Sequence, residues 1–250
     1  MRRFFRMFVL GVLGITVGAI LYEAFMFVRV YRLRSNNPSS TSLMDIRANE
    51  AKEKGQPVKR EQIWVPLDKI STNLQRAVLA GEDTNFATHR GFDYEAIRNA
   101  WDQAQRESAR EAKKEGEDDD WLPSLPEFKR GGSTISQQLA KNLYLSSQRS
   151  FFRKGQEAAL TVMLERSMNK RRILEIYLNV IEWGDGIYGA EAASRRYFRK
   201  SAAALNANEA AFLSAMIPNP RTVFNPQTNP RRVARRQRII MRGMPYVKLP

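Results

Sequence analysis

The sequence predicts an all-α, mostly helical globular domain carried by one N-terminal transmembrane helix. Three observations support this fold class. Residues 7–28 form one long apolar run, and beyond residue 62 apolar residues recur at helical spacing. No run of alternating apolar and polar residues indicates an extended sheet. With 250 residues, 43% of them hydrophobic, the chain has enough material for one good-sized domain plus an appendage.

The composition narrows the chemistry. Lys and Arg number 41 against 26 Asp and Glu, a net charge of +15, so the chain is expected to meet an anionic partner such as nucleic acid, a membrane surface or a phosphorylated substrate. Cysteine is absent, which excludes disulfides, thiol catalysis and Cys-based zinc sites. The single histidine, His89, argues against His-rich metal sites and most metal-dependent hydrolases.

The apolar run at 7–28 is predicted to be an uncleaved transmembrane anchor that follows a short N-terminus, residues 1–6. It has 22 residues and a single charge, Glu23. At about 1.5 Å per residue it can cross a hydrocarbon core of about 30 Å. A cleaved signal peptide is the alternative, but this run is longer than a signal-peptide core and no small-x-small cleavage site follows. Arginines flank both ends, so their count does not decide the orientation.

Residues 29–61 are polar and are predicted to be a linker or stalk, and residues 62–226 the globular domain. The acidic, proline-containing stretch at 102–130 is either a mobile active-site loop, which we favour, or a disordered insertion. The basic tail, 227–250, suits contact with anionic lipid and equally a solvated basic helix. The helices are predicted near residues 68–80, 92–112, 135–145, 154–168, 170–180, 187–199 and 207–216.

The first candidate motif follows the first helix of the domain and starts with Glu82 and Asp83, ending at Gly91. A carboxylate at the C-terminal end of a helix lies near the negative end of the helix dipole and partly out of water. Both effects raise its pKa and make it a better proton acceptor. A structural role for such an acidic pair is the alternative.

The second motif runs from Gly131 to Asn142. Thr134 and Gln137 are spaced for a capping box, and the paired glycines allow close approach to a ligand. Amide and ammonium groups at i, i+3 and i+4 near a helix N-terminus suit a phosphate ligand. The alternative is an ordinary amphipathic helix whose outer face carries Gln138, Lys141 and Asn142.

A third motif combines Arg153, Lys154 and Glu157 at the start of another helix. Arg153 and Glu157 share a face, which offers either an ordinary i, i+4 ion pair or a guanidinium fork for phosphate oxygens beside a second carboxylate. A fourth block ends in Tyr177 and Asn179, which we expect to make packing and hydrogen-bond contacts rather than to take part in chemistry.

Together the four blocks resemble the motifs of the peptidoglycan glycosyltransferase family, over residues 62–226 and in the order and spacing of that family. A Ser-x-x-Lys at Ser167 and Lys170 lies inside these helices, and too few residues follow for a transpeptidase domain, so the resemblance is to the monofunctional branch. Gly81 departs from the Ala or Ser usual in the family. The matching motif residues are Glu82, Asp83, Phe86, His89 and Gly91; Gly131, Gly132, Ser133 and Thr134; Gln138, Lys141 and Asn142; Arg153, Lys154 and Glu157; and Ile173 to Asn179.

The resemblance implies a lysozyme-like helical fold and an inverting transfer that polymerises lipid II into β-1,4-linked glycan strands, releasing undecaprenyl pyrophosphate. It implies Glu82 as the general base and Glu157 as a second catalytic carboxylate. Asp83 is expected to hold its loop, with a structural role for His89 and the glycines. No cofactor is implied with certainty, and a divalent cation, Mg or Mn, is left open. The groups implied to bind substrate are Gln138, Lys141, Asn142, Arg153 and, more doubtfully, Lys154.

By the same resemblance the protein is expected in the cell inner membrane as a single-pass protein, with its N-terminus cytoplasmic and its catalytic domain periplasmic. The expected partners are lipid II, the lipid-linked growing glycan and membrane lipids, and not nucleic acid. Two alternatives remain: a membrane-anchored scaffold that recruits wall-synthesis or cell-division proteins, and a lysozyme-like lytic enzyme, which would not need cations for pyrophosphate.

Overall fold

The computed structural model describes residues 2–96, 98–99, 101–102, 105–106, 133–146 and 150–250. The helix expected near 92–112 lies only partly in these ranges. The stretch 107–130, which holds most of the expected loop, and Gly131 and Gly132 lie outside the described residues.

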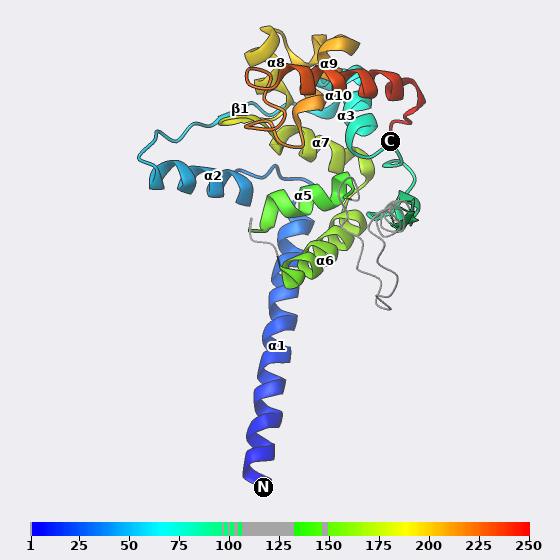
Figure 1. Cartoon of the computed structure of the whole chain (residues 1–250). Coiled ribbons are helices and arrows are strands. Elements are labelled where there is room, and N and C mark those ends of the chain that lie inside the picture. The colour runs from blue at the N-terminus through cyan, green and yellow to red at the C-terminus, as the bar shows by residue number, and fades with distance from the viewer. Residues whose placement is uncertain (1, 97, 100, 103–104, 107–132, 147–149) are drawn as a thin grey trace, which may run out of the picture.

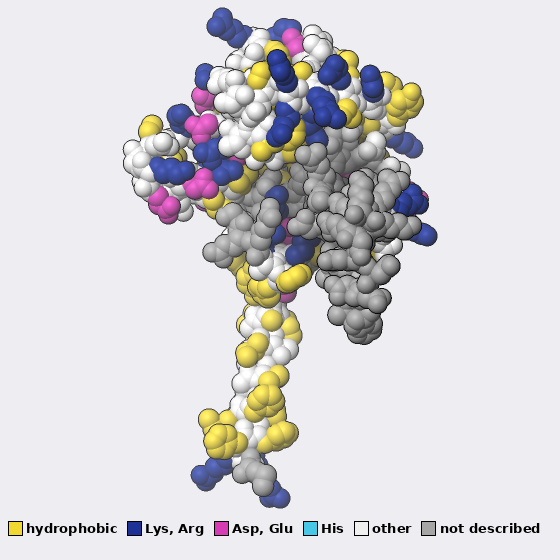
Figure 2. Space-filling model, in the orientation of Figure 1, with side chains coloured by type: hydrophobic (Ala, Val, Ile, Leu, Met, Phe, Trp, Pro, Cys, Tyr) yellow, Lys and Arg dark blue, Asp and Glu magenta, His cyan; other side chains and the backbone are white. Residues whose placement is uncertain are grey.

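The chain begins with one long helix, α1 (Arg2–Arg32), which projects from the domain as a stem (Figure 1). It contains the expected anchor and is long and apolar enough to span a membrane. Most of its side chains are exposed, and apolar ones are visible along the stem in Figure 2. Near its C-terminal end Met26 and Val30 are buried, where α1 packs against α6 (Phe151–Ser167).

The segment expected as a linker contains a helix, α2 (Ser42–Glu53). Thr41 caps it by accepting a hydrogen bond from the Met44 amide, and Met44 is buried in the core. The Ser42 hydroxyl donates to the carbonyl of Leu145, so the helix lies against the domain. Sequence periodicity missed α2 because the helix is short and mostly polar, and its capping threonine was the available signal.

The mostly helical fold is confirmed, and five expected helices form close to their predicted bounds. They are α3 (Thr72–Glu82), α5 (Ile135–Tyr144), α6, α7 (Lys170–Val180) and α9 (Ala207–Met216). The middle of α7 is buried, and α3 packs on α9. Short 3-10 turns, η1 (Leu67–Lys69) and η2 (Ala202–Ala204), connect them.

The helix expected near 187–199 starts later than predicted, as α8 (Ala190–Phe198). Gly189 precedes it with φ +81°, and a Cβ there would lie 2.6 Å from the carbonyl oxygen of Asn179. Only glycine fits this turn without strain, because the backbone has a positive φ and because any side chain would collide with the backbone of Asn179.

A small sheet, which sequence analysis did not predict, lies before α8. Its strands are β1 (Glu61–Gln62), β2 (Glu182–Gly184) and β3 (Ile187–Tyr188), in the order β1-β3-β2. β3 pairs parallel to β1 and antiparallel to β2. Strands of two or three residues are too short for alternation to reveal them.

The basic tail forms α10 (Pro230–Gly243) and a last 3-10 turn, η3 (Met244–Tyr246). α10 packs on α3 and α9 and buries Val233 and Ile240. In Figure 1 it lies at the end of the domain away from the N-terminal end of α1. The tail is thus a basic helix packed on the domain, and contact of its exposed arginines with anionic lipid stays a prediction.

Candidate active site

Glu82 ends α3 and faces the N-terminal part of α5. Its side chain is 8% exposed. The carboxylate accepts hydrogen bonds from Gln138 Nε2 at 2.9 Å and from Arg236 Nη2 at 2.8 Å. Burial raises the pKa of Glu82 above its ordinary value, while Arg236, Gln138 and Lys141 oppose that rise. A carboxylate with a raised pKa binds a proton more readily, as a general base requires.

Asp83 joins three segments behind Glu82. Its carboxylate accepts from His89 Nε2 at 2.9 Å and from the backbone N–H of Ile135 at 2.9 Å. The Gly91 amide donates to His89 Nδ1 at 3.1 Å, so Nδ1 carries no proton and Nε2–H is the donor to Asp83. These contacts connect the end of α3 with the loop that follows it and with the start of α5.

The other residues of the first motif are also packed into the domain. Phe86 is fully buried, and the Lys170 ammonium lies 4.4 Å from the centre of its ring. Gly91 has φ +94°, and a Cβ there would lie 2.8 Å from Thr161 Cγ2. Its carbonyl accepts a hydrogen bond from the Thr134 hydroxyl, which connects the first motif to the second.

The capping box expected from Thr134 and Gln137 is present at the start of α5. One turn after Thr134, Gln138 is held by three groups: it donates to Glu82 and to the Ser133 carbonyl, and its own oxygen accepts from the Tyr177 hydroxyl at 2.8 Å. Tyr177 is fully buried, so it makes the packing and hydrogen-bond contacts expected of it. So does Asn179, which bonds the backbone of Val65 on both sides of its amide.

The third motif supplies a carboxylate surrounded by cations. Glu157 is buried and accepts from Arg153 Nη1 at 3.0 Å and from Lys154 Nζ. Lys141 lies close enough for burial and the charges of Arg153 and Lys154 to lower its pKa, which Glu157 and Glu82 partly oppose. Positive charge is thus crowded on this side of the site. The 50% exposed Lys154 side chain does not line the cleft described next.

A cleft of about 390 Å³ brings together Gln138, Lys141, Asn142 and Arg153. Helix α2 supplies one wall, and the loop from Ile217 to Pro220 another. Glu82 adjoins the cleft through its bond to Gln138. The remaining lining residues are Leu43, Ile46, Arg47, Leu145, Ser146, Tyr177, Ile181 and Glu182.

Sequence analysis missed Arg236, Arg47 and Glu182. Arg236 was counted with the basic tail, yet it lies three residues after buried Val233 and four before buried Ile240. That spacing places Arg236 on the inner face of α10 and was the signal that could have identified it.

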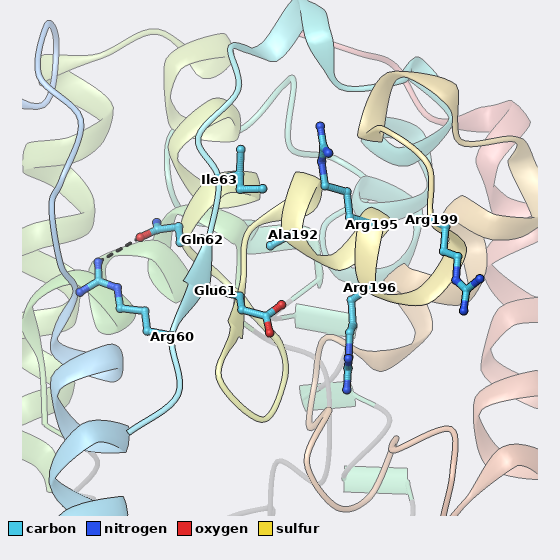
Figure 3. A pocket seen from close by; sticks show the side chains of 8 residues that line it. All are labelled: Arg60, Glu61, Gln62, Ile63, Ala192, Arg195, Arg196 and Arg199. Atoms are coloured by element: carbon cyan, nitrogen blue, oxygen red, sulfur yellow. Dashed lines mark hydrogen bonds between the residues drawn. The ribbon is translucent and has the colours of Figure 1, made fainter. Parts of the chain in front are cut away.

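A second hollow, of about 580 Å³, lies between β1 and α8 (Figure 3). Arg60, Arg195, Arg196 and Arg199 line it, but Figure 3 shows their guanidinium groups pointing in different directions, with the Glu61 carboxylate among them. Groups that diverge do not form one anion site, so this hollow is a weaker candidate than the cleft beside Glu82.

No group of three or more His, Asp and Glu side chains within the described residues is arranged to hold a metal ion. Glu157, the carboxylate nearest the cationic side, is already engaged by two cations. It is therefore a poor ligand for Mg or Mn in this arrangement, and no step of the mechanism below depends on a metal.

Comparisons with known proteins identify the family of the chain. A transglycosylase family model matches residues 49–116 and 122–245. The chain is 47% identical over 231 residues to the biosynthetic peptidoglycan transglycosylase of Aromatoleum aromaticum, with 92% of each chain covered. It is 44% identical to that of Thiobacillus denitrificans over 250 residues, 100% of both chains, and 43% identical to that of Laribacter hongkongensis over 240 residues, 96% of this chain and 97% of the other. The chain thus belongs to the transglycosylase family and is a peptidoglycan transglycosylase, an enzyme that polymerises glycan strands.

Proposed function

We propose that the cleft binds lipid-linked glycan substrates, with lipid II as the acceptor and the growing chain, attached through pyrophosphate to its lipid, as the donor. The observation that carries this proposal is that Lys141 and Arg153 line the same cleft as Gln138, which contacts Glu82. A bound pyrophosphate would offset the burial and the like charges of Arg153 and Lys154, which lower the pKa of Lys141.

The reaction follows from this layout. Glu82 takes the proton of the acceptor's 4-hydroxyl as its oxygen attacks C1 of the donor sugar. The C1–oxygen bond to pyrophosphate breaks, the new glycosidic bond forms with inversion, and undecaprenyl pyrophosphate leaves with the bonding electron pair. Lys141 and Arg153 stabilise the charge that grows on the leaving group. Glu157 holds Arg153 in place by their 3.0 Å ion pair.

The position of Lys141 and Arg153, the two cations that line the cleft, supports a lipid-linked substrate. Arg153 lies in the first turn of α6, directly after Phe151 and Phe152, whose side chains are 99% and 77% exposed. The same helix packs against α1. Exposed aromatic rings beside an apolar stem are typical of a segment that enters the membrane interface. Arg153 would then lie at headgroup depth, where a lipid pyrophosphate is found.

We further propose that α1 spans the inner membrane once, with the N-terminus cytoplasmic and the catalytic domain periplasmic. The proposed lipid-linked substrates support this orientation, since the cleft must face the side of the membrane on which the glycan is assembled. Attachment of a reporter enzyme active only in the periplasm, at either end of the chain, tests it. Activity from the C-terminal fusion alone is expected, and activity from the N-terminal fusion alone would reverse the assignment.

The test of function uses the full chain in detergent with labelled lipid II and separates products by electrophoresis. Wild type should give long strands that lysozyme digests. Glu82→Gln should be about a hundredfold to ten-thousandfold slower, the range expected for loss of a general base. Glu61→Gln is the matched control, because Glu61 is an exposed carboxylate outside the cleft and should behave as wild type.

The outcomes separate the proposals. Shorter fragments from a preformed glycan, with no new polymer, would indicate the lytic alternative. Equal activity of Glu82→Gln and wild type would remove Glu82 as the base. Loss of polymer in Lys141→Met and Arg153→Met, with folding retained, would support the pyrophosphate site, whereas normal activity of both variants would contradict it.

A further inference from the structure

One carboxylate in the cleft has an oxygen without a partner. Glu182, on β2, is 7% exposed and lines the cleft. Its Oε2 accepts hydrogen bonds from Nε and Nη2 of Arg47 at 3.3 and 3.2 Å. Its Oε1 is buried and has no hydrogen-bond partner within the described residues.

The ion pair with Arg47 does not explain this second oxygen. Arg47 fastens α2 to the domain through Oε2 alone, and Glu50 on the same helix adds a second attachment through Arg221 at 3.1 Å. Buried polar atoms in folded proteins almost always have a partner. Because the Glu182 side chain lines the cleft, a rotation of its carboxylate brings Oε1 within reach of a donor on a bound ligand.

The surroundings of Glu182 select the kind of donor. Pyrophosphate oxygens only accept hydrogen bonds, and a carboxylate would repel them. They belong with Lys141 and Arg153 elsewhere in the cleft. Besides Glu182 and its partner Arg47, the lining of the cleft includes aliphatic and proline side chains of α2, of the loop after α9 and of the residue before β2: Leu43, Ile46, Ile181, Ile217, Pro218 and Pro220. Aliphatic side chains together with one unpaired acceptor match an acetamido group, whose methyl packs on them while its N–H donates.

We propose that Oε1 of Glu182 accepts a hydrogen bond from the acetamido N–H of a sugar in the bound glycan. Glu182 is then a substrate-binding residue that fixes the sugar end of the substrate, while Lys141 and Arg153 fix the pyrophosphate end. The inference rests on the proposed substrate and adds the group by which the cleft recognises N-acetylated sugars.

The test compares Glu182→Gln with Glu50→Gln in the full chain, by initial rates of lipid II polymerisation. In Glu182→Gln the amide oxygen will turn to Arg47, which leaves the NH₂ group facing the cleft, where it opposes the substrate N–H. We expect KM to rise about tenfold to a hundredfold, the effect of losing a hydrogen bond to a charged acceptor, and kcat to change little. Glu50→Gln weakens the attachment of the same helix α2, including the ion pair of Glu50 with Arg47, but leaves the Glu182 carboxylate in place, so its KM should stay near that of wild type.

A second substrate identifies the donor. A lipid II analogue with oxygen in place of the acetamido nitrogens should raise the KM of wild type by the same factor, and should have no additional effect in Glu182→Gln. A wild type that makes polymer but does not distinguish the two substrates would overturn the inference while leaving the proposed function intact. Equal KM values for Glu182→Gln and Glu50→Gln would overturn it as well.

The melting temperature of each variant shows whether a rise in KM comes from a folding defect. If Glu182→Gln melts far below wild type, Glu182→Asp replaces it, because aspartate keeps the charge for Arg47 but withdraws the acceptor by one methylene. The same rise in KM is expected from Glu182→Asp. A wild-type KM in a folded Glu182→Asp variant would contradict the proposal.

Discussion

Asp83 is the residue whose contribution can be worked out most directly from the structure. Its carboxylate accepts one hydrogen bond from His89 Nε2–H and one from the Ile135 amide at the start of α5. Because the Gly91 amide fixes the His89 tautomer, both groups facing Asp83 are donors. In Asp83→Asn the new side chain has the same shape but only one oxygen. His89 Nε2 lies 2.9 Å from Oδ1 and 3.0 Å from Oδ2, and the Ile135 amide donates to Oδ2. Whichever way the asparagine turns, its NH₂ group therefore faces the His89 N–H, and in one orientation it faces the Ile135 N–H as well.

The expected cost follows from these contacts. A buried N–H that faces an NH₂ group, together with the loss of the charged acceptor, costs about 1–3 kcal/mol. Removal of a negative charge from the N-terminal end of α5 adds about 0.3–1 kcal/mol. We therefore expect the free energy of unfolding to fall by about 1.3–4 kcal/mol in Asp83→Asn. In a domain of this size, about 1 kcal/mol corresponds to about 2–4 °C in Tm, so Tm should fall by about 3–16 °C.

Thermal unfolding in detergent, followed by Trp fluorescence, measures this change. Asp185→Asn is the matched control: Asp185 is 58% exposed and makes surface ion pairs, so its loss should cost at most about 1 kcal/mol. Polymerisation by Asp83→Asn should also slow, since Asp83 joins the end of α3 to the start of α5 and so sets the approach of Gln138 to Glu82. A variant within about 2 °C of wild type would refute the assigned tautomer and the role of Asp83.

Three further predictions concern pH dependence and packing. The pKa of Glu82 is raised and that of Lys141 lowered, and the base must be ionised while the lysine must be charged. The value of kcat/KM should therefore fall both at acid and at alkaline pH, and the pH range of high activity should be narrower than the range between the ordinary pKa values of Glu and Lys. Lys141→Arg should move the alkaline limb of this profile to higher pH, because arginine stays charged. Arg236→Gln removes the charge that most lowers the pKa of Glu82, so the acid limb should shift to higher pH; an unmoved limb would show that Arg236 does not act on the base. Gly189→Ala, with φ +81° and a Cβ 2.6 Å from the Asn179 carbonyl, should lower the free energy of unfolding by at least about 2 kcal/mol, measured by thermal melting.

Local signals in the sequence predicted most of the helices. The capping box of Thr134 and Gln137 depends on residues three apart and was recovered correctly. The departure at Gly81 has a steric reason that the sequence does not reveal, since a Cβ there would lie 2.7 Å from the hydroxyl of Ser214, a residue far along the chain. That hydroxyl donates to the Ala77 carbonyl in the core, and the missing side chain leaves room for this contact.

Contacts between distant segments were not predictable in the same way. Arg236 bonds Glu82 across 154 positions of sequence, and in the tail it is one arginine among several. Its spacing from Val233 and Ile240 indicates that it lies on the inner face of α10, but only the packing of α10 on α3 shows that this face meets Glu82. The same holds for Glu182. The residues next to it in the sequence give no sign that Arg47, 135 positions earlier, donates to one of its oxygens while the other has no partner within the described residues.

In the proposed membrane arrangement, α1 does more than keep the enzyme near its substrates. Its last turns are fastened to the domain: Gln156 of α6 donates to the Tyr22 hydroxyl at 3.3 Å, and Arg172 donates to the Leu33 carbonyl at 2.9 Å. A flexible tether would raise the local concentration of substrate but would leave the height of the site above the membrane undefined. A stem packed on the helix that carries Arg153 fixes that height instead. Since the pyrophosphate of a lipid-linked substrate has a defined depth, this fixed geometry lowers the entropic cost of bringing it to Arg153.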